Sequence, residues 1–520
     1  MKKIVWLLLT VIVVGVLSGC LGQKDDASSS SGDTIRWFVD SEWYSKQWDE
    51  KNVALDKLIT EETGLRIEFI SGNAEKLGAM IASKDIPDVV TVWNIAPQRK
   101  VLENSGLVAP LDELIKEHAP NFDVPQSVID WYSNEDGHLY GLPNYFYAEE
   151  QLESTENLPT HTSIVARKDF MEQLGIEPED FSTKAGTIAA LKKVKDAKLK
   201  YNGFDVIPAY YDLTNIMQFF GAPLEDKEGN YQEKIRTPEA LESLLFLNEL
   251  YREGLLPQDS LTLTEQQKEE KVNAGSVFSF TNSLITYEGL AAQDPKALYV
   301  AVGPIKGDAG NKMYFDPSPI SGWTLTMIGE NSKKKAEIIK LLEFLSTEEM
   351  VLNAQFGAKG YAWEPDEDGR VVYKEDYQKE LEKDPTQARM KSGADSLPWL
   401  INWIYVMRAS PEPKTPYDIA IAEKDAYFEQ FSFYSLAFEA TNTQGGTEEG
   451  SIQTKIDDYR SQMTAKMVMA KSSDEVKSLY DEMLEQEDKL GYDKLYEYKN
   501  KAFKEAKEKL GLEFAWPGNQ

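Results

Sequence analysis

Apolar and polar positions change period regularly along the chain from position 34. Ile35–Val39 alternates with a period of two, as a half-buried strand does. Asn52–Thr63 has apolar residues at helical spacing, and Gly64 follows where a helix commonly ends. Leu65–Ile70 is strand-like, Ala74–Ser83 is helical, and Pro87–Trp93 is a β-branched run typical of a buried parallel strand. This order predicts an α/β lobe with a parallel sheet.

The same alternation returns in the second half of the chain. Helical spacing recurs at Pro238–Glu253 and Lys334–Ser346, and strand-like runs at Val277–Phe280, Leu298–Val302 and Trp323–Ile328. From Tyr417 to Leu510 the pattern is mostly helical, with Glu and Lys at helical spacing. The globular part, about 490 residues, is longer than one hydrophobic core supports, so two lobes and a helical C-terminal region are expected.

The N-terminus has the layout of a secretory signal peptide. Lys2 and Lys3 precede the apolar run Ile4–Val16, and Leu17-Ser18-Gly19-Cys20 follows with small residues before the expected cleavage point. The apolar run is shorter than the roughly 20 residues of a membrane-spanning helix, which leaves an uncleaved anchor helix as the less favoured alternative. Residues 1–19 are therefore expected to be a signal peptide.

Cys20 is the only cysteine in the chain and so has no intramolecular disulfide partner. Leu17–Cys20 resembles the bacterial lipobox, which would make Cys20 the lipid attachment point and the membrane a partner through that lipid. A free or intermolecular thiol is the alternative. Gln23–Asp33 contains no large apolar residue and is typical of a flexible tether. Residues 20–33 are expected to form the lipid attachment and the tether.

Composition narrows the choice of partner. The formal net charge of −31 argues against nucleic acid, and against an anionic membrane surface, as the main partner. It says little about a small ligand, because the charge inside a pocket can oppose the sign of the whole protein.

Sequence motifs of common enzymes and cofactor sites are missing. The three histidines, His118, His138 and His161, have no metal-ligand spacing, and no HExxH, P-loop, Gly-x-Ser-x-Gly or GxGxxG motif occurs. We therefore expect no catalysis, no cofactor and no metal. Acidic residues are plentiful, so a glycosidase-type carboxylate pair stays open as an alternative that the sequence does not locate.

Several segments together resemble a known protein family. They are Ala82–Val89, Gly106–Leu111, Gly137–Pro143, Ala166–Gly175 and Phe356–Gly360, the last followed by Asp366–Gly369. Each one alone is an ordinary turn or loop, but their order and spacing are similar to the LplA/LipO-like group of family 1 extracellular solute-binding proteins.

The resemblance implies a fold and a function. The expected fold is α/β and of the type II periplasmic-binding-protein-like kind, with a hinge between two lobes and the ligand in between. The implied protein is a monomer on the extracytoplasmic face of the cell membrane that delivers an oligosaccharide to the permease subunits of an ABC importer. A surface glycan-processing enzyme and a peptide-binding lipoprotein are the alternatives. The expected lobes are 34–142 plus 312–370, and 143–311 plus 371–520.

Aromatic and amide side chains at strand ends and in loops are the candidate sugar contacts. Sugars stack their C–H faces on aromatic rings, and their hydroxyl groups need hydrogen-bond partners. The candidates are Trp43, Tyr44, Trp93, Asn94, Asn144, Tyr145, Tyr210, Tyr211, Trp323 and Trp363. Trp43 and Trp93 follow predicted parallel strands, whose carboxyl ends meet at one edge of a sheet. We expect these two to form a stacking floor opposed by Tyr210 and Tyr211 of the other lobe.

One loop departs from the pattern of the family. Many members carry an acidic loop that resembles an EF-hand, with oxygen ligands at alternate positions. The corresponding segment here is Asp196–Pro208, in which Lys198, Lys200 and Val206 replace those ligands. Because calcium needs at least six oxygen ligands and lysines repel it, no calcium is expected at this loop.

Overall fold

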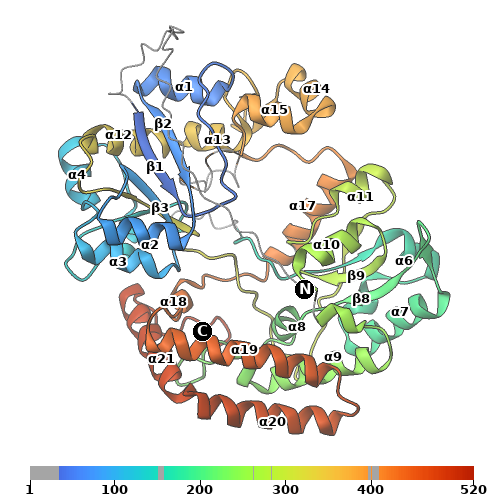
Figure 1. Ribbon diagram of the computed structural model, residues 1–520. Coiled ribbons are helices and arrows are strands. Elements are labelled where there is room, and N and C mark those ends of the chain that lie inside the picture. The colour runs from blue at the N-terminus through green and yellow to red at the C-terminus, as the bar shows by residue number, and fades with distance from the viewer. Residues whose placement is uncertain are drawn as a thin grey trace, which may run out of the picture.

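The computed structural model describes residues 34–149, 157–261, 263–282, 284–395, 397, 400 and 409–520. Cys20 and the expected signal and tether lie outside these residues. Figure 1 shows two lobes side by side, with helices from the C-terminal part of the chain running beneath both. The α/β class expected from the alternation of elements is confirmed.

The first lobe is built on a five-stranded sheet. Its strands, in spatial order, are β2 (Arg66–Ser71), β1 (Thr34–Val39), β3 (Val89–Trp93), β11 (Thr324–Ile328) and β4 (Leu142–Pro143). β1 pairs in parallel with β2 and with β3, whereas β11 is antiparallel to β3 and β4. The chain therefore leaves β1 toward β2 on one side and returns to β3 on the other, which makes β1 and β3 a switch point of the sheet.

Strand alternation divides the first lobe into two cores. Ile35, Trp37 and Val39 pack with α1, α4, α12 and α13, while Phe38 packs on the opposite face with α2, α3 and α5. These helices are α1 (Ala54–Thr63), α2 (Ala74–Ser83), α3 (Pro97–Ser105), α4 (Leu111–His118), α5 (Gln126–Tyr132), α12 (Lys335–Leu345) and α13 (Glu348–Phe356). Gly64 ends α1 with φ of 71°, the left-handed conformation that glycine adopts without a Cβ clash.

A small hairpin and two helices extend the first lobe. They are β12 (Trp363–Pro365), β13 (Val371–Tyr373), α14 (Glu375–Lys383) and α15 (Pro385–Ser392). Val371, Tyr377 and Ala388 share a hydrophobic cluster with Leu352 and Phe356 of α13, and α15 contacts α1. Val371, Tyr377 and Ala388 lie beyond position 370, the expected end of the first lobe in this part of the chain. The lobe boundaries stay a prediction.

The second lobe is built on a four-stranded sheet. Its strands, in spatial order, are β10 (Tyr299–Ala301), β5 (Ile164–Arg167), β9 (Val277–Thr281) and β8 (Ile207–Tyr210). β8 and β9 are parallel, and β5 is antiparallel to both of its neighbours. A two-stranded hairpin of β6 (Lys200–Tyr201) and β7 (Phe204–Asp205) precedes β8.

Helices cover both faces of the second sheet. One face packs on α6, α7, α8 and α9 together with the C-terminal helices α19 and α20, and the other on α10, α11 and α17. The bounds are α6 (Lys168–Leu174), η2 (Pro178–Ser182), α7 (Lys184–Ala197), α8 (Leu213–Phe219), η3 (Lys234–Arg236), α9 (Pro238–Arg252), η4 (Gln258–Leu261), α10 (Glu265–Asn273), α11 (Glu288–Gln293), α17 (Pro416–Glu429), α19 (Glu448–Val468) and α20 (Ser473–Leu490).

Among the described elements, the chain changes lobe after β4, after β10 and between α15 and α17. The last passage leads to α17, then to α18 (Leu436–Glu439) and finally to α21 (Tyr492–Leu510), which packs on α18. In Figure 1, α18 and α21 lie beneath the first lobe, while α19 and α20 run toward the second. The C-terminal helices thus connect the undersides of the two lobes.

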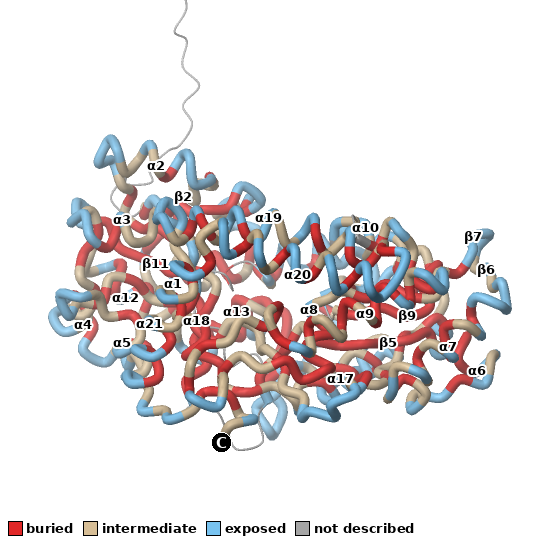
Figure 2. The backbone as a smooth tube through the Cα atoms, turned by 90° about the horizontal axis from the view of Figure 1, so that it is seen from below, coloured by how far each residue is buried: buried red, intermediate tan, exposed pale blue. Residues whose placement is uncertain are grey.

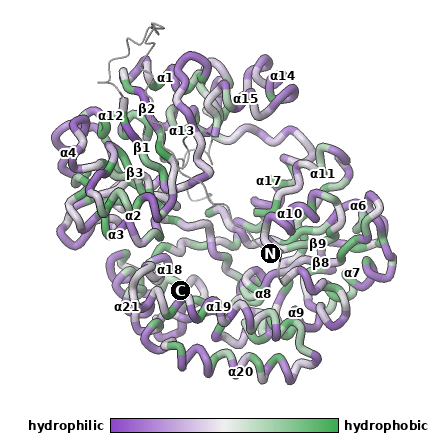
Figure 3. Tube along the Cα trace, in the orientation of Figure 1, coloured by the Kyte–Doolittle hydropathy of each residue, from purple (hydrophilic) through white to green (hydrophobic). Residues whose placement is uncertain are grey.

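Burial follows this layered arrangement. Figure 2 shows β5 and β9 of the second sheet as buried and the β6–β7 hairpin exposed at the far end of the second lobe. Figure 3 shows apolar residues concentrated on the central strands and polar residues along outer helices such as α14 and α20. Within the described part of the chain, none of the helices is both long enough and apolar enough to cross a bilayer.

The C-terminal end of the chain is held by a buried ion pair. Lys507 Nζ donates to Glu225 Oε1 at 2.6 Å, and the side chain of Glu225 is fully buried. Glu225 Oε2 accepts hydrogen bonds from the backbone N–H groups of Ala515 (2.9 Å) and Trp516 (2.8 Å). One carboxylate therefore satisfies three donors of the C-terminal segment.

Glu225→Ala should lower the free energy of unfolding by about 3–5 kcal/mol, because it leaves a buried ammonium without its counter-ion. Lys501→Ala is the control, since Lys501 forms only an exposed pair with Glu505 at 3.8 Å, and such pairs contribute about 0–1 kcal/mol. Urea unfolding of the two variants measures both effects. Equal unfolding midpoints would contradict the structural role given to Glu225.

Candidate functional site

Three of the candidate residues meet at the carboxyl end of β3. Trp93 pairs with Thr324 in the antiparallel register of β3 and β11, and the Asn94 N–H donates to the carbonyl oxygen of Trp323 at 2.7 Å. The side chains of Trp93 and Trp323 are both partly exposed. Because β3 ends where β11 begins, residues 230 positions apart in the sequence become neighbours at this edge of the sheet.

A cavity of about 480 Å³, which we call the main cavity, opens at this edge. Its lining residues come from four separate segments of the chain. They are Trp93, Asn94, Ile95; Leu224, Tyr231; Asp316, Pro317, Pro319, Ser321, Gly322, Trp323; and Ser435, Phe438, Glu439, Thr441, Asn442. The first and third segments flank the first sheet, Leu224 and Tyr231 precede α9 of the second lobe, and the fourth segment surrounds α18. The main cavity therefore lies between the lobes.

Aromatic side chains form much of the wall of the main cavity. Trp93 and Trp323 come from the first lobe, while Tyr231 and Phe438 come from the opposite side. Flat aromatic faces combined with nearby amide and carboxylate groups suit a ligand that has both C–H surfaces and hydroxyl groups.

Asn94 connects the first lobe to the second passage between the lobes. Its Nδ2 group donates to Ser321 Oγ (3.2 Å), to the Gly322 carbonyl oxygen (3.1 Å) and to Tyr132 Oη (2.8 Å). Arg99 Nη1 donates to Asn94 Oδ1 at 2.6 Å and so fixes the orientation of the amide. Asn94 is thus both part of the cavity wall and a structural link.

Glu439 of α18 binds the same passage from the other side. Its carboxylate accepts hydrogen bonds from the Ile320 N–H, from Ser321 Oγ and, at 3.1 Å, from the Ser321 N–H. Burial raises the pKa of Glu439, and these hydrogen bonds act in the opposite direction. Gly322 follows with φ of +87°, where an added Cβ would lie 2.5 Å from the Tyr145 carbonyl oxygen, so only glycine fits there.

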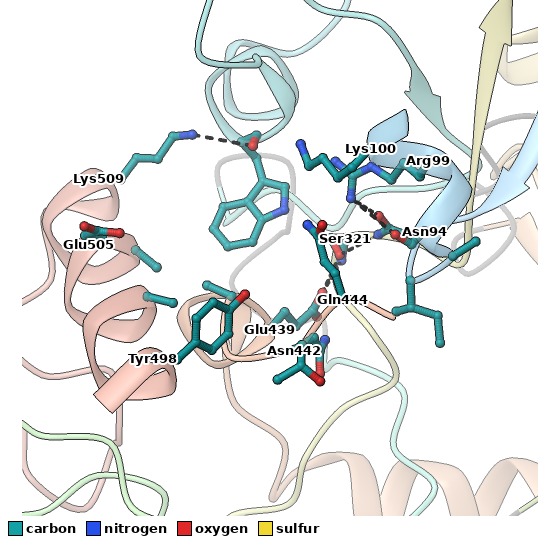
Figure 4. A pocket seen from close by; sticks show the side chains of 17 residues that line it. Asn94, Arg99, Lys100, Ser321, Glu439, Asn442, Gln444, Tyr498, Glu505 and Lys509 are labelled. Carbon is teal, nitrogen blue, oxygen red and sulfur yellow. Dashed lines mark hydrogen bonds between the residues drawn. The ribbon is translucent and has the colours of Figure 1, made fainter. Parts of the chain in front are cut away.

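A second chamber of about 340 Å³ adjoins the main cavity (Figure 4). The two share Asn94, Ile95, Ser321, Glu439 and Asn442. The second chamber continues between α3 and α5 of the first lobe and the helix α21. A ligand longer than the main cavity would extend in this direction.

Asn144 and Tyr145 were expected to contact the ligand, but both are only 1% exposed. Asn144 Oδ1 accepts hydrogen bonds from the backbone N–H groups of Trp323 (2.8 Å) and Thr324 (3.1 Å). The amide thus orients the start of β11, and with it Trp323. Tyr145 packs against Tyr147 with ring centroids 5.0 Å apart, inside the first lobe.

Trp43 and Tyr44 follow β1, but only Trp43 is exposed, at 56%. Tyr44 is buried and packs edge-on against Phe69, with ring centroids 5.3 Å apart. Neither residue lines the main cavity or the second chamber. The expected part of Trp43 in a stacking floor stays a prediction.

Tyr210 and Tyr211 are core residues of the second lobe, which differs from the expected position opposite Trp93. They are 3% and 4% exposed, and they fall in the hydrophobic clusters on the two opposite faces of the second sheet. The hydroxyl group of Tyr211 lies 2.9 Å from Ser279 Oγ. Consecutive residues of a strand point to opposite faces, so the pair does not form one aromatic surface.

Trp363 is also a core residue rather than a residue at the cavity surface. It is 2% exposed, and its indole N–H donates to the Gly357 carbonyl oxygen at 2.7 Å. The hairpin β12–β13 supplies this burial by packing on α13.

Several cavity residues have no signal in the local sequence. Tyr231, Phe438, Glu439 and Asn442 line the main cavity from segments far from β3 in sequence. The pair Phe438-Glu439 is compatible with an ordinary short helix, and the contact of Glu439 with Ser321 depends on tertiary structure alone.

The loop at Asp196–Pro208 forms the β6–β7 hairpin. Asn202 and Gly203 have φ of 49° and 87°, as a two-residue hairpin turn requires, and Lys200 Nζ lies 2.9 Å from Asp205 Oδ1. Among the described residues, no group of three His, Cys, Asp or Glu side chains is arranged to hold a metal ion. The expectation that this loop binds no calcium stays a prediction.

Two α/β lobes, the passages between them and an aromatic cavity where β3 ends and β11 begins define a protein of the solute-binding class. The profile of the bacterial extracellular solute-binding protein family matches residues 46–351. The chain belongs to this family. Its resemblance to the LplA/LipO-like group, seen in the sequence segments, agrees with this membership.

The chain is similar to individual proteins at low sequence identity. Lipoprotein LipO of Bacillus subtilis (strain 168) is 22% identical over 388 residues, which cover 69% of this chain and 73% of LipO. An extracellular solute-binding protein from Bifidobacterium longum subsp. infantis has a TM-score of 0.70 at 15% identity, covering 91% of this chain and 98% of that protein. The S. pneumoniae ABC-transporter substrate binding protein FusA, solved in complex with kestose, has a TM-score of 0.67 at 15% identity, covering 92% and 100%.

Proposed function

We propose that this protein binds an oligosaccharide reversibly in the main cavity and delivers it to an ABC importer. The single observation that carries the proposal is the cavity between the lobes, with Trp93 and Trp323 on one side and Tyr231 and Phe438 on the other. Trp93 and Trp323 are partly exposed, whereas Tyr231 and Phe438 are 7% and 8% exposed and pack on Phe503, so the two tryptophans are the proposed stacking faces for a sugar ring. The structural neighbour FusA, whose structure contains kestose, supports this ligand class.

Lobe closure would couple binding to delivery. The wall residues belong to both lobes and to the passages between them, so a bound sugar stabilises the arrangement in which the two sides approach. The closed lobes then present a surface that the permease subunits distinguish from the open form. The proposed function requires neither a nucleic acid partner nor a second copy of the chain.

The contacts of the two carboxylates in the main cavity favour a binding protein over a glycosidase. A glycosidase needs two carboxyl groups free to act on the glycosidic bond. Asp316 is paired with Lys234, and Glu439 accepts three hydrogen bonds from Ile320 and Ser321. Both groups already hold the passage between the lobes, so we propose that the sugar leaves unchanged.

Trp93→Ala and Trp323→Ala should each weaken oligosaccharide binding by about 1–3 kcal/mol, or roughly tenfold to hundredfold in Kd, because each removes a stacking face. A thermal-shift panel of neutral and acidic oligosaccharides, with peptides as the competing class, first identifies a ligand for the mature protein. Isothermal titration calorimetry then measures the Kd of each variant.

Trp363→Ala is the matched control for these two variants. Because its ring is buried away from the cavity, the substitution should lower the free energy of unfolding by about 3–5 kcal/mol and leave the Kd of folded protein unchanged. Normal affinity in both Trp93→Ala and Trp323→Ala would contradict the proposed site. Release of shortened sugars by the purified protein, or a response to peptides alone, would contradict the proposed function.

We further propose that a lipid on Cys20 anchors the protein at the extracytoplasmic face of the membrane, with residues 20–33 as the tether. The lipobox-like segment carries this proposal, and buried acyl chains hold a protein through about 0.8 kcal/mol for each CH₂ group.

Cys20→Ser should release the protein from the membrane or leave it as an uncleaved precursor, since serine lacks the thiol to which the lipid is attached. Membrane fractionation followed by immunoblotting checks the outcome. Mature, membrane-bound Cys20→Ser protein would show that the anchor is elsewhere.

A further inference from the structure

Among the described residues, the second chamber contains one ammonium group, that of Lys509, with no carboxylate within ion-pair distance. Figure 4 shows Lys509 of α21 on one side of the chamber and Arg99 and Lys100 of α3 on the other. The remaining charged groups of the lining are Glu439 and Glu505. The contacts of these five side chains determine which charged group is available to pair with a ligand.

Three of the five charged groups, Arg99, Lys100 and Glu439, have close partners in the protein. Arg99 Nε and Lys100 Nζ lie 2.8 Å and 2.5 Å from the two carboxylate oxygens of Glu103. Glu439 accepts the hydrogen bonds from Ile320 and Ser321 described above. Glu505 lines the chamber one turn before Lys509 on α21, and its side chain is 65% exposed and lies 3.8 Å from Lys501.

Lys509 differs from the other four. Its Nζ atom has a single long contact of 3.5 Å with the Trp131 carbonyl oxygen and lies 6.0 Å from the centroid of the Trp131 ring. No carboxylate in the described part of the chain lies within ion-pair distance of it. Burial lowers the pKa of Lys509 and Lys100 lowers it further, while Asp130 acts in the opposite direction. An anion in the chamber would relieve both unfavourable effects.

Neutral groups complete a surface for one sugar ring. The indole of Trp131 lies next to Lys509, and Asn442, Gln444 and Tyr498 contribute amide and hydroxyl groups to the same chamber. An aromatic face, neutral hydrogen-bonding groups and one unpaired ammonium together match a sugar that carries a carboxylate.

We propose that the second chamber receives an acidic end residue of the oligosaccharide, a uronate, with Lys509 as the counter-ion of its carboxylate. This inference rests on the proposed function, because the rest of the oligosaccharide would occupy the adjoining main cavity. The net charge of −31 does not oppose it, since the sign of the charge at a ligand is set locally and distant exposed carboxylates are screened by salt.

The test compares D-glucuronate with its methyl ester, two probes of the same sugar that differ in the charge of the carboxyl group. Calorimetry or ligand-observed NMR should show about tenfold tighter binding of glucuronate to the wild-type protein, as expected for one charge-assisted hydrogen bond. Lys509→Met should abolish this preference and leave binding of the ester unchanged. Lys509→Arg should retain it.

Lys504→Met is the matched control, because Lys504 lies on the same helix and does not line the chamber. It should keep the preference for glucuronate. Equal binding of glucuronate and ester to the wild-type protein, no detectable binding of glucuronate, or an unchanged preference in Lys509→Met would each overturn the inference. An equal loss of the glucuronate preference in Lys504→Met would also overturn the inference, because it would attribute the preference to the overall charge of the protein.

The outcome is separable from that of the proposed function. If a neutral oligosaccharide binds and Trp93→Ala weakens it, while glucuronate is not preferred over its ester, the proposed function stands and the acidic end residue is wrong. If no sugar of either kind binds, both are wrong.

Discussion

The site depends on the peptide around Ser321, where the second passage between the lobes is bound from two sides. Asn94 donates to Ser321 Oγ and to the Gly322 carbonyl oxygen from the first lobe, and Glu439 accepts from Ile320 and Ser321 below it. Tyr132 adds a hydrogen bond from its hydroxyl group to the Ser321 carbonyl oxygen. A short segment thereby joins the first lobe, a passage and the C-terminal helices.

The cavity follows from this attachment. Trp323 stands two residues after Ser321 and Asp316 five residues before it, while Phe438 precedes Glu439 directly. The hydrogen bonds of Ser321 with Asn94 and Glu439 therefore fix three segments of the cavity wall relative to one another. Glu439 and Asn94 use their polar groups in these structural contacts, while Trp93 and Trp323 line the cavity beside them.

Local sequence patterns predicted the elements well. Ala74–Ser83 is a helix with the expected bounds, and the strand expected at Ile35–Val39 begins one residue earlier, at Thr34. Such segments are determined by periodicity and by end signals such as Gly64, both of which lie within the segment itself. The rule that parallel strands end at a common edge directs attention to Trp93 and Asn94, which line the cavity; their contact with a ligand stays a prediction.

The cavity wall opposite Trp93 and Trp323 could not be predicted from the sequence. Tyr210 and Tyr211 have the expected chemistry, but Tyr210 ends β8 and Tyr211 directly follows it, and the two side chains enter two different cores. Trp363 is buried because a distant helix, α13, covers its hairpin. Tyr231 and Phe438 reach the cavity through the packing of the C-terminal helices, which depends on contacts such as Lys507 with Glu225. No pattern within a single segment encodes such contacts.

Hydrogen–deuterium exchange with and without an oligosaccharide tests the central claim most directly. If the ligand binds between the lobes, it should slow exchange together in residues 93–95, 224–231, 316–323 and 435–442, which supply the walls of the main cavity from both sides. Protection confined to one lobe, or located away from these four segments, would contradict the account.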